Sequence, residues 1–252
     1  FGTDGIATTI IGTSSQIFSI TLQSDGKIVA AGVAAISGVN QFVIARYDTS
    51  GALDTTFGTN GIATTIIGTS SQINSIKIQS GGKIVAGGFA IIGGVIQFAL
   101  ARYNINGSLD TTFGTNGITT TAIGTTTSQI NEIALQSDGK IVAAGIATIG
   151  GVTQFTLARY NIDGTLDATF NLSGATPGIV TTAIGSFSQA STVVIQSDGK
   201  IVAGGFSVIS GVIQFATARY NTNGLLDTTF GTNGIATTAI GTTSSITSIL
   251  VQ

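Results

Sequence analysis

The sequence predicts an all-β protein built from four copies of one unit, and three observations support this fold class. A glycine-containing string that starts with FGT recurs at regular intervals along the 252 residues. Between these strings, apolar and polar residues alternate with a period of two, as they do in half-buried strands. Asp-Gly, Asn-Gly and Ser-Gly pairs separate the alternating segments, and such pairs favour the tight turns of β-hairpins.

The recurring string defines the copies. FGTDGIATT begins at Phe1, close variants begin at Phe57, Phe113 and Phe230, and the longer FNLSGATPGIVTT begins at Phe170. The expected copies are residues 1–56, 57–112, 113–169 and 170–229, with a partial fifth copy over 230–252. Because no linker or change in composition interrupts the copies, we expect a single repeat array over residues 1–252.

Each copy is expected to contain four strands. In the first copy they cover residues 16–23, 27–36 and 41–47, and a fourth short strand lies around Ile62, after the next FGT string. The same pattern predicts one more fourth-type strand over residues 5–11 and one more first-type strand over residues 246–251. No segment keeps a 3.6-residue period, so we expect roughly sixteen strands in the full copies and little or no helix.

A unit of 56 residues with four antiparallel strands has the size of a β-propeller blade. One small sheet cannot bury two apolar faces by itself, whereas neighbouring copies can cover them. The alternative is a β-solenoid in which each unit makes about three coils. Four distinct hairpin-type turns in each copy favour a β-propeller-type array of four-stranded antiparallel blades over that solenoid.

These copies resemble the delta-60 repeat family, a bacterial repeat with a propeller-like fold. The matching strings are LQSDGKIVAAG at Leu22, FVIARYDTSGALDTTFGTNG at Phe42, FALARYNINGSLDTTFGTNG at Phe98, FTLARYNIDGTLDATF at Phe155 and FATARYNTNGLLDTTF at Phe215. The sequence departs from the family at Gly81, which replaces an Asp, and at the insertion over residues 171–177. The resemblance implies a secreted or surface repeat protein and brings no established catalytic residues.

Charged residues are few, and 15 of the 20 fall at four repeated positions. These are a Lys after the Asp-Gly turn (Lys27, Lys83, Lys140, Lys200), an Arg before a Tyr (Arg46, Arg102, Arg159, Arg219), an Asp after a Leu (Asp54, Asp110, Asp167, Asp227) and the Asp of the turn (Asp25, Asp138, Asp198). A catalytic site needs different groups that converge on one point. Groups that recur in every copy are instead spread along the array, which favours a structural role.

For the repeated Arg we expect a bidentate ion pair with the repeated Asp, as between Arg46 and Asp54, that fixes the turn between them. Binding of a ligand by the row of arginines is the alternative. Glu132 is the only Glu, and we expect it to be a solvent-exposed charge on a strand. The turn over residues 48–51 is similar to half of a calcium loop but has no Glu after it, so we expect an Asx turn rather than a calcium site.

The composition excludes several kinds of site. The sequence has no Cys and no His, and therefore no disulfide, no zinc or haem site of the usual kind and no Ser-His or Cys-His nucleophile. A net charge of −2 offers no field for nucleic acid. Residues 84–101 carry no charge but are interrupted by Gly-Gly, so we expect a β-hairpin there and no membrane insertion. We predict no catalytic, cofactor-binding or metal-binding residue and no cofactor.

The expected strands do not divide into complete blades, because one extra strand stands at each end of the array. Exposed apolar edge strands promote aggregation. We therefore expect a segment of a longer chain, or protomers that complete one another's blades and so associate with themselves through edge strands.

Three hypotheses for the function follow. The leading one is a non-enzymatic repeat scaffold of a secreted or cell-surface protein, used for adhesion, protein binding or assembly. The second is a structural subunit that polymerises through its unmatched terminal strands into a fibre or layer. The third is a carbohydrate-binding module or an enzyme with its chemistry in loops such as residues 171–177, which would make a glycan the ligand. The expected location is extracellular or on the cell surface.

Overall fold

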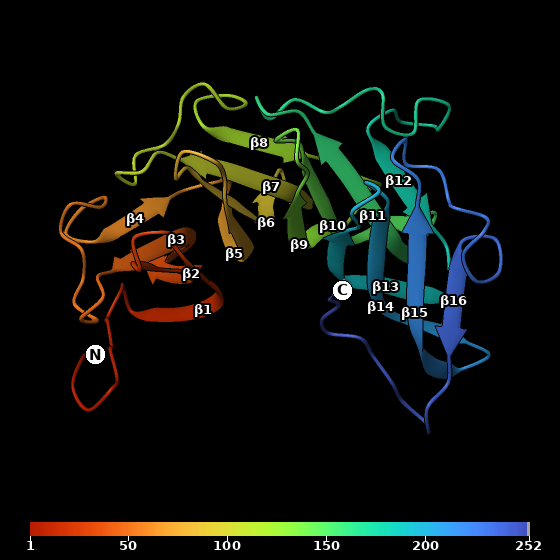
Figure 1. Ribbon diagram of the computed structural model, residues 1–252, viewed down its shortest axis with the longest axis horizontal. Coiled ribbons are helices and arrows are strands. Elements are labelled where there is room, and N and C mark those ends of the chain that lie inside the picture. Colours follow the sequence, from red (N-terminus) through yellow and green to blue (C-terminus); the bar gives the residue numbers. More distant parts are fainter. Residues whose placement is uncertain (251–252) are drawn as a thin grey trace. The chain divides into compact units, whose positions relative to one another are not determined.

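The computed structural model describes residues 1–250, and within that range it contains strands, turns and irregular segments but no helix (Figure 1). In this described part of the chain, sixteen strands form four sheets, and each sheet holds four strands in the order of the sequence. Neighbouring strands of a sheet are antiparallel throughout. This pairing confirms the predicted four-stranded antiparallel blades and contradicts the β-solenoid. We refer to the sheets as blades 1 to 4.

The chain forms two compact units, Phe1–Thr121 and Ala122–Gln252, and each unit contains two blades. Blade 1 consists of β1 (Ser14–Leu22), β2 (Ile28–Ile36), β3 (Val39–Tyr47) and β4 (Ile62–Thr65), and blade 2 of β5 (Ser70–Ile78), β6 (Ile84–Ile92), β7 (Val95–Tyr103) and β8 (Ile118–Thr121). Blade 3 consists of β9 (Ser128–Leu135), β10 (Ile141–Ile149), β11 (Val152–Tyr160) and β12 (Ile179–Thr182), and blade 4 of β13 (Phe187–Ile195), β14 (Ile201–Ile209), β15 (Val212–Tyr220) and β16 (Ile235–Thr238).

The second and third strands of each blade form a hairpin with a two-residue turn. In blade 1 this turn is Ser37 and Gly38, with φ angles of 51° and 80°. Positive φ at both positions is the requirement of a type I′ turn, whose twist matches that of the strands. The predicted hairpin over residues 84–101 has the same turn and is formed by β6 and β7. Among residues 1–250 there is no helix long and apolar enough to cross a membrane.

The first strand of each blade carries a β-bulge opposite a glycine of the second strand. In β1 the pairing register shifts between Ile17 and Ser19. A Cβ atom on Gly32 would collide with the carbonyl oxygen of Gln16 at this point, so the close approach of the two backbones requires glycine. The same glycine recurs in the other three blades, as Gly88, Gly145 and Gly205.

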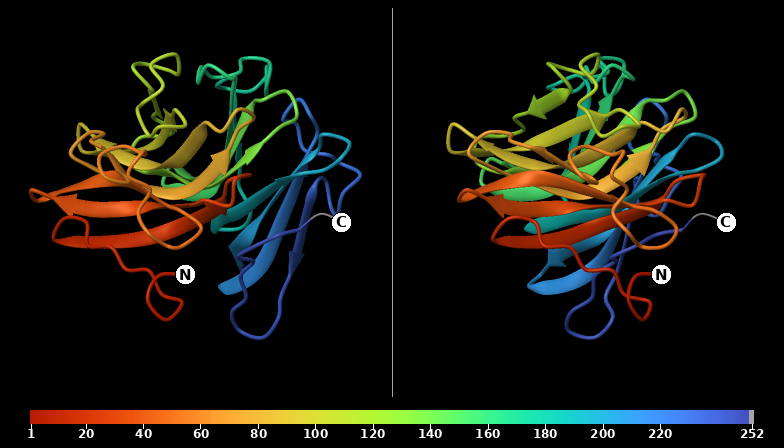
Figure 2. Two further views of the ribbon diagram at one scale, coloured as in Figure 1. Left: turned by 60° about the vertical axis from the view of Figure 1, so that its left-hand side comes forward. Right: turned by 90° about the vertical axis from the view of Figure 1, so that its left-hand side faces the viewer.

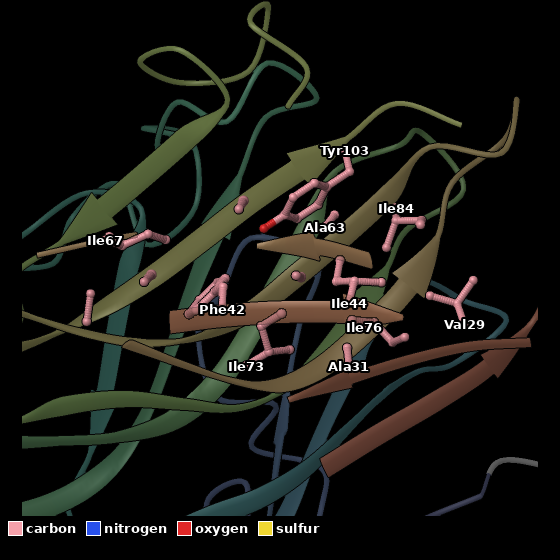
Figure 3. Close-up of a cluster of buried hydrophobic side chains, with 14 of the residues drawn as sticks. Val29, Ala31, Phe42, Ile44, Ala63, Ile67, Ile73, Ile76, Ile84 and Tyr103 are labelled. Carbon is pink, nitrogen blue, oxygen red and sulfur yellow. The ribbon is translucent and has the colours of Figure 1, made fainter. Parts of the chain in front are cut away.

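The apolar core lies between neighbouring blades of a unit. We call the side of blades 2 and 4 that packs on the other blade of the same unit their upstream face, and the opposite side their downstream face. The equivalent sides of blades 1 and 3 take the same names. In the first unit, Phe42 and Ile44 of β3 pack with Ile73 and Ile76 of β5, and each of the four is at most 2% exposed (Figure 3). The second unit repeats this arrangement with Phe155, Leu157, Ala190 and Val193.

Two of the predicted strands do not form. Residues 5–11 are not a strand, although Thr3 and Ile6 make an isolated bridge, and Figure 2 shows the segment before β1 as an irregular loop. A fourth strand pairs with the third strand of the copy before it, as β4 pairs with β3, and residues 5–11 make no pairing of this kind. Residues 246–250 are not a strand either. A first strand pairs with the second strand of its own copy, as β1 pairs with β2, and residues 246–250 make no pairing of this kind. Val251 lies outside the described residues.

Candidate functional site

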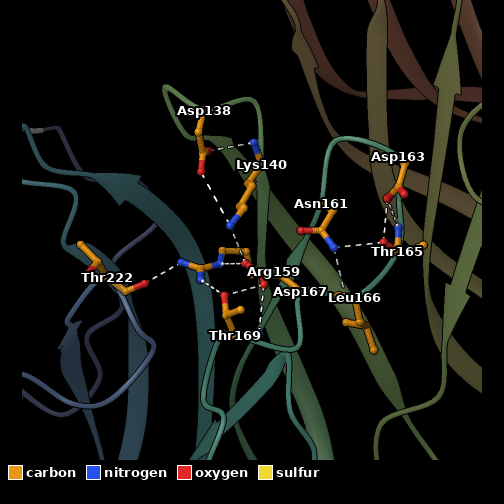
Figure 4. A network of polar contacts seen from close by, with 10 residues as sticks. All are labelled: Asp138, Lys140, Arg159, Asn161, Asp163, Thr165, Leu166, Asp167, Thr169 and Thr222. Atoms are coloured by element: carbon orange, nitrogen blue, oxygen red, sulfur yellow. Dashed lines mark hydrogen bonds and ion pairs between the residues drawn. The ribbon is translucent and has the colours of Figure 1, made fainter.

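Each blade carries the same cluster of a Lys, an Asp and an Arg, which we call the Lys–Asp–Arg cluster. In blade 3, Oδ2 of Asp167 lies 2.7 Å from Nε of Arg159 and 2.9 Å from Nζ of Lys140 (Figure 4). Oδ1 of Asp167 accepts hydrogen bonds from the backbone N–H and the hydroxyl of Thr169, at 3.0 and 2.6 Å. The counterparts are Lys27, Arg46 and Asp54; Lys83, Arg102 and Asp110; and Lys200, Arg219 and Asp227.

The ends of two neighbouring strands bring the three side chains together. Arg159 is the penultimate residue of β11, and Lys140 directly precedes β10, the strand paired with β11. After β11 the chain turns back, and the backbone N–H of Asp167 donates to the carbonyl of Arg159 at 2.9 Å. The cluster therefore fastens the turn that follows the third strand to the turn that precedes the second.

The carboxylates of these clusters are held in their ionised form. Burial by itself would raise the pKa of Asp167, but hydrogen bonds from Thr169 and Lys140 outweigh it and hold the pKa well below its usual range. For Asp54, the hydrogen bond from the Thr56 hydroxyl is the largest of the effects that lower the pKa. Because the ionised form is the one that accepts these bonds, the lowered pKa means that the bonds stabilise the fold at neutral pH.

The arginine of the cluster also links two blades of a unit. Nη1 of Arg46 donates to the carbonyl oxygen of Ile105, in the turn after β7 of blade 2. Nη1 of Arg159 donates in the same way to the carbonyl of Thr222 in blade 4 (Figure 4). The guanidinium carbon of Arg46 stands 4.6 Å from the centre of the Phe57 ring, within cation–π range. The guanidinium of Arg46 therefore contacts the carboxylate of Asp54, the ring of Phe57 and a carbonyl of the neighbouring blade.

The predicted pairing of the repeated Arg with the repeated Asp is confirmed in all four copies. Its bidentate geometry is wrong for Arg46, because the carboxylate of Asp54 binds Nε while Nη1 and Nη2 reach Ile105 and Thr56. The roles of the lysine, the threonine and the phenylalanine were not anticipated from the sequence. Their fixed spacing from the Arg in every copy is the signal that could have indicated them.

The prediction that Glu132 is a solvent-exposed charge is wrong. Glu132 is half-buried, and its Oε2 accepts a hydrogen bond of 2.8 Å from the backbone N–H of Val193 in blade 4. In the first unit the hydroxyl of Ser19 accepts the equivalent bond from Ile76, at 3.1 Å. The carboxylate therefore occupies a repeated structural position between blades, next to the β-bulge.

The predicted Asx turn is confirmed. Oδ1 of Asp48 accepts hydrogen bonds from the backbone N–H and hydroxyl of Ser50 and from the N–H of Ala52. The bond from the Ser50 hydroxyl is the main reason that the pKa of Asp48 is lowered. Within residues 1–250 no group of three or more acidic side chains is arranged to hold a metal ion.

A cleft of 620 Å³ lies in the first unit, between the loop that precedes β4 and the turn that follows β7. Thr59, Thr64, Asn106 and Ser108 supply its polar lining. The ionisable group in this lining is Tyr103, whose pKa is raised by burial and whose hydroxyl lies 2.7 Å from Thr65 Oγ1. The cleft thus offers hydroxyl and amide groups for hydrogen bonding.

Three solved structures show a distant likeness to the chain. Sqt1 from Chaetomium thermophilum is 14% identical with a TM-score of 0.40, and the match covers 83% of this chain and 44% of Sqt1. Sqt1 bound to the N-terminus of the ribosomal protein L10 is 12% identical with a TM-score of 0.44, covering 92% and 65%. The extracellular domain of BT4673, a one-component system of B. thetaiotaomicron, is 13% identical with a TM-score of 0.41, covering 91% and 30%.

The chain thus spans less than two thirds of each of these structures. No curated protein matches its sequence.

A family profile described as a domain of unknown function (DUF5122) beta-propeller matches the chain four times. The matched stretches are residues 23–57, 79–113, 136–170 and 196–230. Each stretch runs from the turn before the second strand of a blade, through the whole Lys–Asp–Arg cluster, to the Phe beneath the Arg. A propeller-type repeat family is therefore confirmed, whereas the delta-60 name stays a prediction. Because the four matches together cover more than half of its residues, the chain belongs to the DUF5122 β-propeller family.

Proposed function

We propose that this β-propeller repeat domain is a non-enzymatic scaffold that binds protein partners through the turns at the ends of its blades. The proposal is based on the observation that the repeated Lys, Asp and Arg side chains bind one another inside each blade. Asp110 is 4% exposed, and its Oδ2 contacts both Arg102 and Lys83. With these groups engaged in structural bonds, the exposed turns are left to recognise other molecules.

The turn after the third strand offers an apolar anchor in two of the blades. Ile105 in blade 2 is 60% exposed and Ile162 in blade 3 is 59% exposed. The backbone of Ile105 is held in place because its carbonyl accepts the bond from Arg46. Protein interfaces bury apolar anchor residues within a polar rim, and an exposed apolar side chain on a polar turn can supply such an anchor. Because the turn is already rigid, its binding costs little conformational entropy.

A binding comparison tests this proposal. The double variant Ile105→Ser, Ile162→Ser and the original chain are immobilised and exposed to fractionated surface and secreted proteins of the organism that produces the chain. We expect one partner to bind the original chain saturably and the double variant at least about 10-fold more weakly, as for loss of interface anchors. Ile66→Ser is the matched control, because Ile66 is 62% exposed but lies outside these turns.

Two results would contradict the proposal. The first is binding that the double variant and the Ile66→Ser control reduce equally. The second is turnover of a substrate in a panel of hydrolase and glycosidase assays.

We also propose an extracellular or cell-surface location, which is supported by the resemblance to surface repeat proteins and agrees with the absence of cysteine from the sequence. Fractionation of the producing cells with an antibody against the chain tests the location. Recovery of the protein in the cytoplasmic fraction would contradict it.

A further inference from the structure

We propose that blade 2 binds a carboxylate group of a protein partner at the turn over residues 79–83, which precedes β6. That the carboxylate belongs to a protein rests on the proposed function. The binding site itself follows from a comparison of this turn in the four blades, because three of them hold a carboxylate of their own at the same place.

In blades 1, 3 and 4 the carboxylate comes from the Asp of the Asp-Gly turn. In blade 3, Oδ1 of Asp138 accepts a hydrogen bond of 3.1 Å from the backbone N–H of Lys140, and Oδ2 of Asp138 lies 3.8 Å from Nζ of the same lysine (Figure 4). The counterparts are Asp25 with Lys27, at 3.2 and 3.7 Å, and Asp198 with Lys200, at 3.1 and 3.7 Å. A backbone N–H and an ammonium group therefore bind the two oxygens of one carboxylate.

Blade 2 keeps the two donors but lacks the carboxylate. Gly81 replaces the Asp, and a Cβ atom placed on Gly81 would have no neighbouring atom within 4 Å. Within residues 1–250, Asp110 is the one acidic partner of the Lys83 ammonium group, and the backbone N–H of Lys83 has no acceptor. The Lys83 side chain is 40% exposed, against 29–31% for the equivalent lysines. The place of the missing carboxylate is therefore open to solvent.

The backbone closes this turn in blade 2 as it does in blade 1. Gln79 N–H donates to the carbonyl of Lys83 at 2.8 Å, and Gly82 N–H donates to the carbonyl of Gln79 at 3.0 Å. The equivalent bonds of blade 1 are 2.9 and 3.0 Å long. The backbones differ at Gly81, which has a φ of 84°, whereas the Asp at this position in the other blades has a negative φ. Because the closing bonds and the Lys83–Asp110 contact are kept, the two donors lie as they do in the other blades.

The charge at this end of blade 2 also favours an anion. Lys83 and Arg102 bring two positive charges to the cluster and Asp110 one negative charge, whereas the turn Asp balances the charge in each of the other blades. The turns over residues 79–83 and 104–108 contain no acidic residue. Arg102 and Asp110 are buried, so the charge that solvent meets at the cluster is that of Lys83. Hydrogen bonds from an ammonium group to a carboxylate are stronger than those between neutral groups.

An apolar side chain lies beside the open place. A Cβ atom on Gly82 would stand 3.2 Å from Cδ1 of Ile105, so the side chain of Ile105 packs on the turn that carries Lys83. Ile105 is the exposed residue that we propose as an interface anchor. A partner segment with an Asp or Glu next to an apolar residue can contact both Lys83 and Ile105. In such an interface the charge sets the orientation and the apolar anchor supplies affinity.

The test follows the backbone amide signals of the whole isotope-labelled chain by NMR, with sodium acetate at pH 7 as the probe and sodium chloride to keep the ionic strength constant. We expect the amide signal of Lys83 to shift saturably, with a Kd of roughly 10–100 mM, as for one or two charge-assisted hydrogen bonds. The amides of Lys27, Lys140 and Lys200 should show no saturable shift, because each already binds an Asp. Acetate binding needs no protein partner, so this result is separate from the test of the proposed function.

Two variants exchange the turn residue between blades. Gly81→Asp gives blade 2 the carboxylate of the other blades and should abolish the acetate shift of Lys83. Asp25→Gly removes the carboxylate from blade 1 and should make the amide of Lys27 respond to acetate as Lys83 does in the original chain. Gly81→Asp requires a negative φ at residue 81, as at Asp25, and unchanged amide signals of β6 and β7 would show that blade 2 is folded. Asp25→Gly places no side chain in a restricted conformation, so it tests the site independently.

A second probe distinguishes a carboxylate of a protein from that of a small acid. The capped dipeptide Asp-Leu offers a carboxylate next to an apolar side chain, and we expect it to bind at least about 3-fold more tightly than acetate. Ile105→Ser should remove this gain and leave acetate binding unchanged. Ile66→Ser is the matched control and should affect neither probe, because Ile66 is exposed outside these turns.

Four outcomes would overturn the proposal. The first is no saturable shift of the Lys83 amide up to about 500 mM acetate, well above the expected Kd. The second is an equal shift at Lys27 in the original chain. The third is a folded Gly81→Asp that still responds at Lys83, or a folded Asp25→Gly that does not respond at Lys27. The fourth is equal affinity for acetate and the dipeptide, which would contradict a protein as the source of the carboxylate.

Discussion

Blades 1 and 2 carry nearly the same residues on their upstream faces, and they differ in what covers these residues. Ile76 is 2% exposed because blade 1 lies against it, whereas its counterpart Ile20 is 66% exposed. The strands, the bulge and the register around both residues are the same. The comparison shows that a blade forms its sheet from its own sequence but obtains a dry interior only from the neighbouring copy, as expected for a quasi-one-dimensional array.

The Lys–Asp–Arg cluster is present in every blade, and its response to acid tests whether it stabilises the fold. We expect acid to lower the free energy of unfolding more than any single substitution, because all four clusters lose their charged carboxylate together. The pKa values of Asp54, Asp110, Asp167 and Asp227 all lie below the ordinary value of 3.8 in the folded chain. The unfolded chain therefore binds more protons in acid. The stability that these groups contribute is present above about pH 4 and is lost as the pH falls below it.

Denaturant unfolding at pH 7, 4 and 2.5 measures this effect. We expect a small change in the free energy of unfolding between the first two values and a steep fall below pH 4. An equal stability at pH 7 and pH 2.5 would show that the carboxylates do not hold the turns.

Removal of a single carboxylate distinguishes a cluster whose Arg is buried, as Arg102 is, from one whose Arg is partly exposed, as Arg219 is. A buried ion pair that loses one partner costs ~3–5 kcal/mol. For Asp110→Ala we expect about 2–4 kcal/mol, because Lys83 at the edge of the cluster is 40% exposed. Asp227→Ala should cost less, since its partner Arg219 is 21% exposed. Thermal unfolding of both variants measures the difference, and equal losses would contradict the dependence of the cost on burial of the Arg.

Truncation of the counterpart isoleucines tests the comparison at the apolar face. Ile76→Ala should lower the free energy of unfolding by about 3 kcal/mol, because it leaves a cavity between two blades. Ile20→Ala should change it by less than about 0.5 kcal/mol, as is usual at an exposed site. The measurement is denaturant unfolding at low protein concentration, where chains are separate. Similar losses for the two variants would mean that Ile20 is covered in solution.

Removal of the repeated tyrosine hydroxyl gives the smallest expected effect. In Tyr103→Phe the bond to Thr65 is lost, which should cost about 1 kcal/mol. Tyr47→Phe should cost less, since its partner Thr9 belongs to the irregular segment before β1. Thermal unfolding again provides the measurement. A larger loss for Tyr47→Phe would show that residues 1–12 are held more firmly than the neighbouring blade.

The strands and turns of the four blades could be predicted from the sequence because their signals are local. Period-two alternation marks β2 and β3, and the two-residue turn at Ser37 and Gly38 fixes their register. The failed predictions over residues 5–11 and 246–250 have the opposite cause. The same residues form a strand only where a partner strand is present, so a local pattern cannot decide the outcome.

The cluster was only half predictable, for a related reason. Spacing along the chain pointed to Arg46 and Asp54, which lie on the two sides of one turn. Lys27 reaches Asp54 from another turn, through the pairing of β2 with β3, and its part follows from the sheet register. Glu132 was misread because its partner, the N–H of Val193, belongs to a different blade.

The most direct test of the central claim uses the absence of natural cysteine from the sequence. Ile20→Cys and Ile76→Cys each introduce one thiol, at equivalent positions of the uncovered and the covered upstream face. With a maleimide under native conditions and at low protein concentration, Ile20→Cys should react at the rate of a free thiol, whereas Ile76→Cys should react at least ~100-fold more slowly because the blades must separate first. Equal labelling rates in two folded variants would contradict the claim that each blade is kept dry by its neighbour.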